Sequence, residues 1–481
     1  MASSLALLQW DAEICMPRGG VTHRGEQMAL LAGLVHDRST DPRIGELLDD
    51  IEASSLVQDP ESPEAVNVRE LRREFDKETR LPRRLVEELA RVSALASQSW
   101  SEARDRDDFK SFAPWLDQTF ALAREKADAI GYKGVRYDAL LDDYEPGMTT
   151  EQLSTLFAEL GPKLVPIVDA LRDRQHSTPD DMLEREFPLD EQRDFAENIA
   201  AKLGFDRECG RFDLGPHPFC TMIGTGDVRI ASRYHPRIFS SGFLGVMHET
   251  GHALYEQGLD PAHYGTPMGE AVSLGVHESQ SRLWENYVGR SNGFWLHFYP
   301  QLQNTFKDSL HDVPLESFRA VMNHVAPGLI RVEADELTYN LHIVIRFEIE
   351  RALLADDLRA ADVPGAWSES YQRYLGITPD SDRNGCLQDI HWSEGLIGYF
   401  PTYTLGNVYA AQLFDAAELA VGPLEKAFAA GEFGTLRTWL NENVHRHGKR
   451  YTPVALVERV TGNPPNPSAM IKSLAARYRP A

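Results

Sequence analysis

The sequence predicts a mainly α-helical protein with a short stretch of strands and turns immediately before one buried helix. Apolar residues recur at helical spacing along most of the chain, and helix-start signals precede several of these stretches. Only residues 210–240 change to strand and turn patterns. At 481 residues the chain is long enough for a single domain, 1–481, around a deep cleft. Two helical halves that flank the groove are the alternative division.

Helix-start signals mark several of the helical stretches. Ser62 precedes Pro63, a pair typical of a helix N-terminus because serine caps the helix and proline fits its first turn. Leu81-Pro82 interrupts this stretch, and Thr149 to Gln152 resembles a capping box. Together with the apolar spacing, these signals predict helices over residues 63–78, 85–95, 153–160, 190–203 and 334–354.

Residues 210–240 are rich in glycine and proline, and the run from Asp227 to Tyr234 alternates polar and apolar side chains. This pattern predicts strands and turns. A strand edge at this position could hydrogen-bond an extended peptide backbone. A purely structural hairpin is the alternative interpretation.

The next run predicts a buried helix that carries a metal site. Phe243 to Met247 is apolar, and apolar residues return after His248-Glu249-Thr250-Gly251-His252. Two histidines four residues apart project from one helix face, so both imidazoles can bind one Zn²⁺. Glu249 can then accept a proton from a water on the metal. Histidines that merely pack in the core are the alternative, but they do not account for the glutamate between them.

A third metal ligand is expected downstream. Glu278 lies near the beginning of a helix predicted over residues 277–286, as in zinc sites built from two histidines and one glutamate. A third histidine is excluded, because the positions that HExxHxxGxxH requires hold Tyr255 and Gly258. Spacing alone leaves three other acids within reach, Glu256, Glu270 and Glu285.

Composition limits the partners and the environment of the chain. The net charge of −24 argues against nucleic acids and anionic membranes as partners, because both would be repelled. No apolar run is long enough to span a membrane, and the first residues do not resemble a secretion signal. The four cysteines lack CxxC spacing, which predicts reduced thiols in a cytoplasmic protein.

Several segments, in order, resemble the carboxypeptidase Taq family of metallocarboxypeptidases along nearly the whole chain. These segments are Leu8-Gln9-Trp10-Asp11, Met16-Pro17-Arg18-Gly19-Gly20, Asn67-Val68-Arg69-Glu70, His217-Pro218-Phe219, His248 to His252, His277-Glu278-Ser279-Gln280, Ile330 to Asp335, Gly385 to Trp392 and Gly398 to Asn407. HExxH occurs in many families, whereas the later segments in this order are highly specific.

The resemblance implies a helical metallopeptidase with a deep active-site groove, a small sheet beside the metal helix and removal of single residues from peptide C-termini. It implies His248, His252 and Glu278 as metal ligands and Glu249 as catalytic base. One Zn²⁺ per chain suits these ligands, with Co²⁺ or Mn²⁺ as alternatives. Homodimers are usual in this family, so a homodimer is expected.

The chain departs from the family pattern in two places. The family's Asp-x-Arg-x-Thr segment appears here as Asp227 to Ala231, without the final hydroxyl, which puts its role in positioning substrate in doubt. The sequence also begins almost directly at the Leu8 to Asp11 segment, where relatives usually carry a preceding helical segment. This shorter start is expected to expose part of the groove or to weaken dimer contacts.

Removal of the last residue of a peptide requires a cation for the free α-carboxylate, and arginine matches a carboxylate with two parallel hydrogen bonds. Arg331 is the first candidate. Arg346 is the second, since its spacing would place it on roughly the same helix face. An ion pair of Arg331 with Asp335, four residues on, is the structural alternative.

Peptide hydrolysis also requires donors for the oxyanion, and His391 and Tyr403 are the candidates. Each lies in a segment too rich in glycine, proline and aromatic residues for an ordinary helix. His217 is expected to bind the substrate carbonyl or to orient the water. Packing roles are the alternative for all three, and Asp389 is a candidate partner for a ligand imidazole.

The sequence therefore predicts a cytoplasmic zinc metallocarboxypeptidase that acts on peptides. Two alternatives stay open. One is a dipeptidase or endopeptidase on the same scaffold, and the other is a catalytically silent peptide-binding protein. The presence of Glu249 alongside all three ligands argues against the silent protein.

Overall fold

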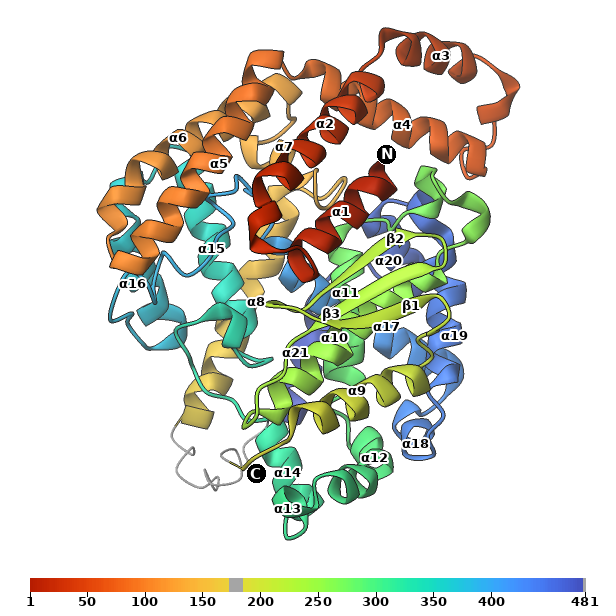
Figure 1. Ribbon diagram of the computed structural model, residues 1–481, viewed down its shortest axis with the longest axis vertical. Helices are drawn as coiled ribbons and strands as arrows, with labels where there is room; N and C mark the ends of the chain where they lie inside the picture. Colours follow the sequence, from red (N-terminus) through yellow and green to blue (C-terminus); the bar gives the residue numbers. More distant parts are fainter. Residues whose placement is uncertain (173–184, 479–481) are drawn as a thin grey trace.

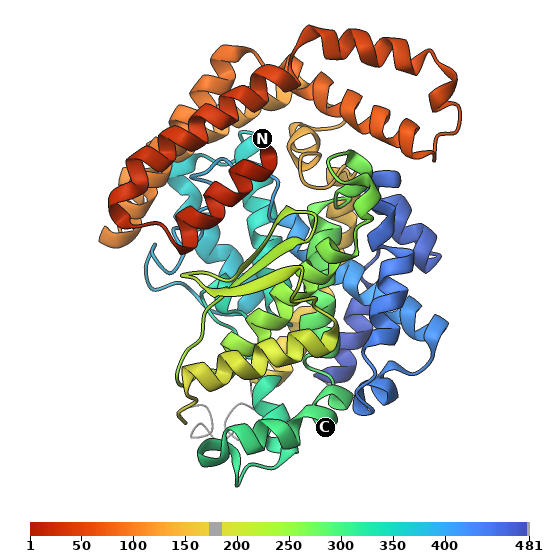
Figure 2. The same cartoon turned by 45° about the vertical axis from the view of Figure 1, so that its right-hand side comes forward.

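Helices form most of the computed structural model, which describes residues 1–172 and 185–478 (Figures 1 and 2). The helices before the sheet are α1 (Ala2–Ile14), α2 (Val21–Ser39), α3 (Pro42–Glu52), α4 (Pro63–Arg80), α5 (Arg83–Arg106), α6 (Phe109–Ile130), α7 (Arg136–Leu141), α8 (Thr150–Arg172) and α9 (Leu189–Leu203). The strands are β1 (Gly210–Leu214), β2 (Phe219–Gly224) and β3 (Asp227–Ser232). The helices after the sheet are α10 (Phe239–Gly258), α11 (Leu274–Arg282), α12 (Asn292–Thr305), α13 (Lys307–Leu310), α14 (Leu315–Met322), α15 (Tyr339–Leu354), α16 (Val363–Leu375), α17 (Pro401–Val421), α18 (Leu424–Ala429), α19 (Gly434–Asn443), α20 (Pro453–Thr461) and α21 (Ser468–Arg477). The predicted fold class, mainly α with a small sheet, is confirmed.

The sheet has the strand order β1-β3-β2, with β1 parallel and β2 antiparallel to the central β3. One face packs on α10, and Val228 and Ile230 of β3 are buried there in the main core. Helix α1 covers the other face, where Trp10 packs with Ile223 and Ala231 (Figure 1). The sheet is thus a layer between the N-terminal helix and α10, and its place beside α10 is the one that the resemblance implies.

Ala231 stands where the resembled family has threonine. Its side chain is fully buried on the face that α1 covers, not on the face toward α10. Arg229 forms a double hydrogen bond with Asp227, at N–O distances of 2.8 and 2.7 Å, and its guanidinium carbon lies 5.8 Å from the centre of the Trp10 ring. This segment therefore holds α1 on the sheet, and the side chain at position 231 lies beneath Trp10.

Two of the predicted helix starts are confirmed by their capping contacts. Ser62 Oγ accepts a hydrogen bond from the Ala65 amide at 3.2 Å at the start of α4. Thr149 and Gln152 exchange the two hydrogen bonds of a capping box before α8. Helices α4, α5, α8 and α9 therefore begin close to where local sequence signals predict them.

The predicted beginning of the helix over residues 334–354 is wrong. The carboxylate of Asp335 accepts hydrogen bonds from the amides of Leu337 and Thr338, both at 2.9 Å, and α15 begins only at Tyr339. Arg331 consequently lies in a short 3₁₀ turn before the helix, so it shares no helix face with Arg346. The alternative of an ion pair between Arg331 and Asp335 is also wrong, because the Asp335 carboxylate binds the two backbone amides just before α15 instead.

Helix α11 packs against both α10 and α17, and two glycines allow this close approach. A Cβ atom on Gly251 of α10 would lie 2.5 Å from the carbonyl oxygen of Gln280 in α11. A Cβ atom on Gly406 of α17 would lie 2.4 Å from Cγ of Glu278. Any side chain at either position would push the helices apart. The two contacts thus hold Glu278 at a set distance from α10.

The first helices form a layer above the rest of the molecule (Figure 2). A cavity of about 690 Å³ lies between α2, α4 and the beginning of α11, and Phe75, Tyr144 and Leu274 are among its lining residues. Leu274 is the first residue of the helix that carries Glu278. The cavity therefore adjoins the region where the sequence predicts the metal site.

Two expectations about the environment of the chain can be compared with the structure. All four cysteines have free thiols, as their spacing predicts. Across residues 1–172 and 185–478, no helix combines the length and the apolar character that a membrane crossing requires.

Glu145 lies buried where α11 meets α17. Its Oε2 atom accepts a hydrogen bond from the Gly275 amide at 3.0 Å, and Oε1 accepts one from the Tyr409 hydroxyl at 2.9 Å. Burial raises the pKa of Glu145 from 4.5 to about 7. The folded state therefore favours the protonated form of Glu145. The contribution of Glu145 to the free energy of unfolding is complete below pH 4.5 and is lost as the pH rises through about 7.

We expect Glu145→Gln to remove this part of the pH dependence of stability. The wild-type protein should lose up to about 3 kcal/mol from Glu145 between pH 4.5 and 7, whereas the amide cannot ionise. Urea unfolding of both proteins at pH 5 and pH 8 measures the difference. An equal loss of stability in both proteins would show that Glu145 ionises without cost.

Candidate metal centre

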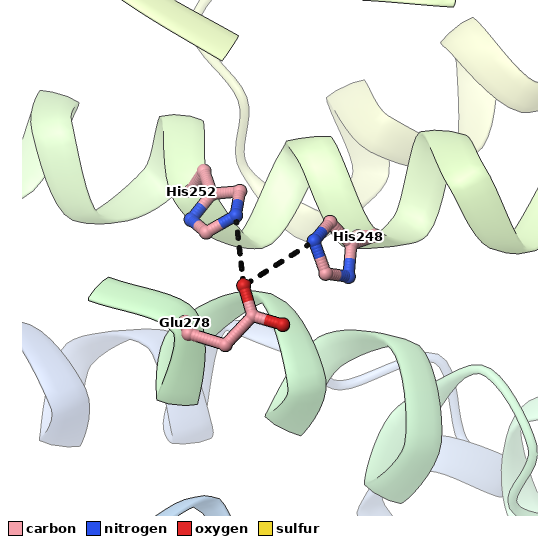
Figure 3. A group of neighbouring side chains, drawn as sticks. All are labelled: His248, His252 and Glu278. Carbon is pink, nitrogen blue, oxygen red and sulfur yellow. Dashed lines mark ion pairs between the residues drawn. The ribbon is translucent and has the colours of Figure 1, made fainter. Parts of the chain in front are cut away.

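Two histidines of α10 and one glutamate of α11 converge on one point (Figure 3). The Nε2 atoms of His248 and His252 lie 3.6 and 3.5 Å from Oε2 of Glu278. Tetrahedral zinc with bonds of about 2.0–2.2 Å places its ligand atoms roughly 3.4 Å apart. Two imidazole nitrogens and one carboxylate oxygen at these distances fit such an ion. A fourth position is left for water or substrate.

The protonation states of His252 and Glu278 suit a metal ion. Burial lowers the pKa of His252 to about 3, so its imidazole is neutral at pH 7. Burial by itself would raise the pKa of Glu278, but the Arg282 guanidinium and the neighbouring imidazoles hold it well below its usual range. Arg282 Nε donates to Oε1 of Glu278 at 2.7 Å, and Oε2 faces the histidines.

The three other acids within sequence reach have different partners. Glu256 pairs with His277, and Glu270 pairs with Lys449. Glu285 lies on the far side of the His248 ring, with Oε2 2.8 Å from Nδ1. Among the residues that the structure describes, His248, His252 and Glu278 form the sole cluster of metal-binding side chains. The geometry thus favours Glu278, the acid that the sequence predicts, as third ligand.

Glu285 orients the first histidine. It accepts the Nδ1 proton of His248, which leaves the Nε2 lone pair for an ion, and Arg282 Nη1 lies 3.2 Å from the same oxygen. A π-helical turn over Leu283–Val288 directly follows α11 and carries Glu285. Sequence spacing placed Glu285 near the site only as a rival ligand, because a π turn has no clear signal in a single sequence.

A second histidine supports His252. Its Nδ1 atom lies 2.6 Å from Nδ1 of His277, and Nε2 of His277 lies 2.8 Å from Oε1 of Glu256. If Nε2 of His252 binds the ion, its Nδ1 carries a proton and donates it to His277. His277 then donates from Nε2 to Glu256. Sequence analysis missed this relay, since it depends on how α10 and α11 pack.

Glu249 is buried beside the ligands, with 6% of its surface exposed. Burial is the main cause that raises its pKa to about 7, and the nearby Glu278 carboxylate raises it further while His248 lowers it. A carboxyl group with a pKa near 7 can both accept and release a proton at neutral pH. This is the property that a general base beside a metal site needs.

Arg331 and Arg346 meet at one carboxylate. Their Nη2 atoms lie 2.8 and 2.7 Å from the two oxygens of Asp389. Arg346 is fully buried and also donates to the His342 carbonyl and the Gln388 side chain. The predicted direct contact of Arg346 with substrate does not fit this burial. Asp389 binds these two arginines, and not a ligand imidazole as the sequence suggested.

Tyr339 lies between this pair and the metal ligands. Its hydroxyl accepts a hydrogen bond from Nη1 of Arg331 at 2.9 Å. The guanidinium carbon of Arg282, which holds Glu278, lies 4.4 Å from the centre of the same ring. Neither Tyr339 nor Arg282 was singled out from the sequence, because nothing in their spacing links them.

His391 and Tyr403 lie side by side, with Nε2 3.2 Å from the hydroxyl oxygen. Burial lowers the pKa of His391 to about 4 and raises the pKa of Tyr403 well above its usual value, so both are uncharged donors at pH 7. The prediction that Tyr403 lies outside a helix is wrong. It lies in the first turn of α17, where Pro401 is tolerated because the first amides have no helical partner.

His217 is exposed in the turn between β1 and β2. Cγ of its neighbour Pro218 lies 3.8 Å from the place of a Cβ atom on Gly245, three residues before His248 in α10. The turn therefore lies over the metal helix. A contact of His217 with substrate stays a prediction.

The chain also matches known proteins along its length. A family model described as carboxypeptidase Taq (M32) metallopeptidase matches residues 1–478. The chain belongs to the M32 family. Thermostable carboxypeptidase 1 of Thermus thermophilus is 49% identical, over 99% of this chain and 95% of the relative. Carboxypeptidase 1 of Bacillus subtilis is 36% identical, with the same coverage of 99% and 95%.

Solved structures agree with this assignment. The M32 carboxypeptidase of Deinococcus radiodurans is 42% identical and has a TM-score of 0.96, over 99% of this chain and 95% of that structure. Metallocarboxypeptidase 1 of Trypanosoma cruzi is 36% identical and has a TM-score of 0.94, over 100% and 96%. The predictions of the carboxypeptidase Taq family and of a metallocarboxypeptidase are confirmed.

Two substitutions in this M32 chain distinguish a residue that binds the metal from a residue that only positions a metal-binding histidine. If Glu278 is one of three protein ligands, Glu278→Ala should cost the purified protein most of its bound zinc. Glu285→Ala removes only the partner of His248 and should weaken zinc binding by about 10–100-fold. Glu270→Ala, away from both histidines, is the control and should bind zinc as the wild type does. Competition with a fluorescent chelator measures all three, and unchanged zinc affinity in Glu278→Ala would identify another acid as the ligand.

Proposed function

We propose that this M32 metallocarboxypeptidase releases single amino acids from peptide C-termini with one Zn²⁺ per chain, held by His248, His252 and Glu278. The observation that carries the proposal is the convergence of these three side chains beside the buried Glu249. Co²⁺ and Mn²⁺ are the alternative ions, because two histidines and one carboxylate accept them too. Activity restored to the metal-free protein by each ion in turn identifies the preferred one.

Glu249 acts in this proposal as the general base. The chemistry supplied by a bound ion is Lewis-acid activation of a water molecule and of the scissile carbonyl. Glu249 accepts a proton from the attacking water and passes it to the leaving amine. Its pKa of about 7 supports both steps, since neither form of the carboxyl is strongly favoured at neutral pH.

Tyr403 and His391 are proposed to stabilise the oxyanion. Both are uncharged donors at pH 7, and a donor held in a buried site need not reorganise as charge develops on the carbonyl oxygen. His217, in the turn above α10, is proposed to contact the substrate backbone.

Arg331 is proposed to bind the free α-carboxylate. Tyr339 and Asp389 hold its guanidinium in place. Arg346 acts as a positioning residue, because it binds the second oxygen of Asp389 from a fully buried position.

The remainder of a long substrate is proposed to extend toward the cavity of about 690 Å³. Ring contacts of Tyr403 with Tyr399, and of Tyr399 with Tyr144, lead from the site to this cavity.

The same scaffold could serve a dipeptidase or an endopeptidase. The buried Arg331 favours an exopeptidase over an endopeptidase, since an endopeptidase needs no cation for a free C-terminus. A long peptide with a blocked N-terminus distinguishes them, because a carboxypeptidase shortens it by one residue at a time. A silent peptide-binding protein would leave it intact.

We further propose that residues 1–481 act as one catalytic domain, in the cytoplasm, as a homodimer. One continuous apolar core, with members from Ala96 to Tyr478, supports the single domain. Four free thiols suit a reducing compartment. The homodimer rests on the family pattern, and light scattering of the purified chain tests it.

We expect Glu249→Gln to retain zinc and to lose turnover by about 10²–10⁴-fold, because the ligands stay intact while the base is lost. Zinc stoichiometry and kcat on a blocked dipeptide are measured on the same preparation. A variant that holds zinc and keeps more than a few per cent of wild-type kcat would exclude Glu249 as the base.

We expect Arg331→Ala to lower kcat/KM for peptides with a free C-terminus by about 2–4 kcal/mol, or roughly 30- to 1,000-fold. Amidated peptides lack the carboxylate, so they should be poor substrates of the wild type and should lose little more in the variant. Arg331→Lys, which keeps the charge without the two-pronged geometry, should fall between. Equal losses with acid and amide peptides would make Arg331 structural.

A further inference from the structure

A second cavity, of about 490 Å³, lies at the C-terminal end of the metal helix α10, between the sheet and α19. This volume suits a small organic molecule. Apolar side chains form much of its wall, Met222, Val228, Leu254 and Leu259. The residues proposed above for catalysis and for contact with substrate do not line it.

His445 presents a hydrogen-bond acceptor to this cavity. The Ser279 hydroxyl donates to the Val276 carbonyl, so it accepts a hydrogen bond from the Nε2 amide group of Gln280. The Oε1 atom of Gln280 is then the group that faces Nε2 of His445, at 2.9 Å. Because Oε1 can only accept, Nε2 of His445 carries the ring proton. Burial lowers the pKa of His445 to about 3, so the ring is neutral and Nδ1 keeps its lone pair. The Nδ1 atom lies close to Gly258, which lines the cavity: a Cβ atom added to this glycine would lie 2.4 Å from Nδ1.

His445 is 1% exposed, and the described residues provide no hydrogen bond to its Nδ1 atom. Glu256 lines the same cavity. One of its oxygens accepts from His277, and no lysine or arginine of the described part of the chain pairs with it. A buried lone pair and a carboxylate without a cationic partner therefore face one space with apolar walls.

We propose that this cavity binds a small organic cation, an alkylguanidinium or alkylammonium group with a short apolar stem, and that its binding loosens the metal centre. The cation donates to the Glu256 carboxylate and to Nδ1 of His445, while the stem packs on Leu254 and Met222. A simple amine or a free basic amino acid carries this chemistry. Arg437 lines the cavity without an ion pair among the described residues, so it would hold the α-carboxylate of an amino acid.

The coupling to the metal runs through Glu256. Its carboxylate accepts from His277, and His277 accepts from His252. A cation bound to Glu256 draws the carboxylate charge away from this relay and weakens the support of a metal ligand. This part rests on the proposed role of His252, whereas binding of the cation does not.

Isothermal titration with propylguanidinium tests the site, with its uncharged analogue propylurea as control. The wild type should bind propylguanidinium in the millimolar range or tighter and propylurea at least about ten-fold more weakly, because a charge-assisted hydrogen bond contributes about 1.5–3 kcal/mol. Glu256→Gln should lose most of this difference. Arginine as titrant distinguishes the two sources, since Arg437→Gln should weaken arginine binding and leave propylguanidinium unaffected.

Two tryptophan substitutions on α19 locate the binding. Thr438 lines the cavity and is exposed, so Thr438→Trp should fill its mouth and abolish binding without disturbing the core. Thr435→Trp, exposed on the same helix outside the cavity, is the matched control and should bind as the wild type does. Absence of propylguanidinium binding to the wild type, or binding that survives Thr438→Trp, overturns the proposal.

Zinc affinity then tests the coupling. Saturating propylguanidinium should raise the zinc dissociation constant of the wild type by about 3–10-fold in chelator competition, within the range expected for loss of a ligand's partner. Zinc should weaken propylguanidinium binding by the same factor, because coupling is reciprocal. Thr438→Trp should show no such effect. Binding without a change in zinc affinity overturns the coupling, and a wild type that holds no zinc would instead contradict the proposed metal site.

Discussion

The contact between α10 and α11 is the constraint on which the rest of the site depends. At Gly251 the backbones approach so closely that a Cβ atom would meet the Gln280 carbonyl, and this spacing brings Glu278 within 3.5 and 3.6 Å of the two histidines. Gly406 of α17 presses on Glu278 from the opposite side. The glycine within the HExxH segment is therefore as important to the site as its ligands, although it has no chemical role.

Burial of charge is the main electrostatic cost of this arrangement, and pairing offsets it. Arg282 lies against both Glu278 and Glu285, while Asp389 lies between Arg331 and Arg346. Each cluster carries an excess of one sign. Two carboxylates face one guanidinium at the candidate ligands, where a metal ion would supply positive charge. Two guanidiniums face one carboxylate at Asp389, where a substrate carboxylate would supply negative charge. The imbalance in each cluster matches the charge of the group that it is proposed to receive.

The parts of the site that depend on local spacing could be predicted from the sequence, and those that depend on tertiary packing could not. His248 and His252 follow from helical periodicity, whereas spacing left Glu278 as one of four candidate acids and the resemblance to the family selected it. The partner of Arg331 was sought four residues away, at Asp335, but it is Asp389, distant in sequence. The Asp335 carboxylate instead binds the amides of Leu337 and Thr338 in a local turn, and α15 begins only after this turn. Resemblance to a family supplied the segment that contains Asp389, but not the pairing.

The position of Tyr339 links the two clusters into one site. Its hydroxyl binds Arg331, and its ring packs on Arg282, so a rigid phenol separates the cation at the proposed carboxylate site from the cation that holds Glu278. A flexible side chain would let this distance vary, whereas an aromatic ring in a buried position does not. Removal of a single residue requires that the C-terminal carboxylate and the scissile carbonyl lie one residue apart. A fixed spacer between the groups that bind them is a physical means to set that separation.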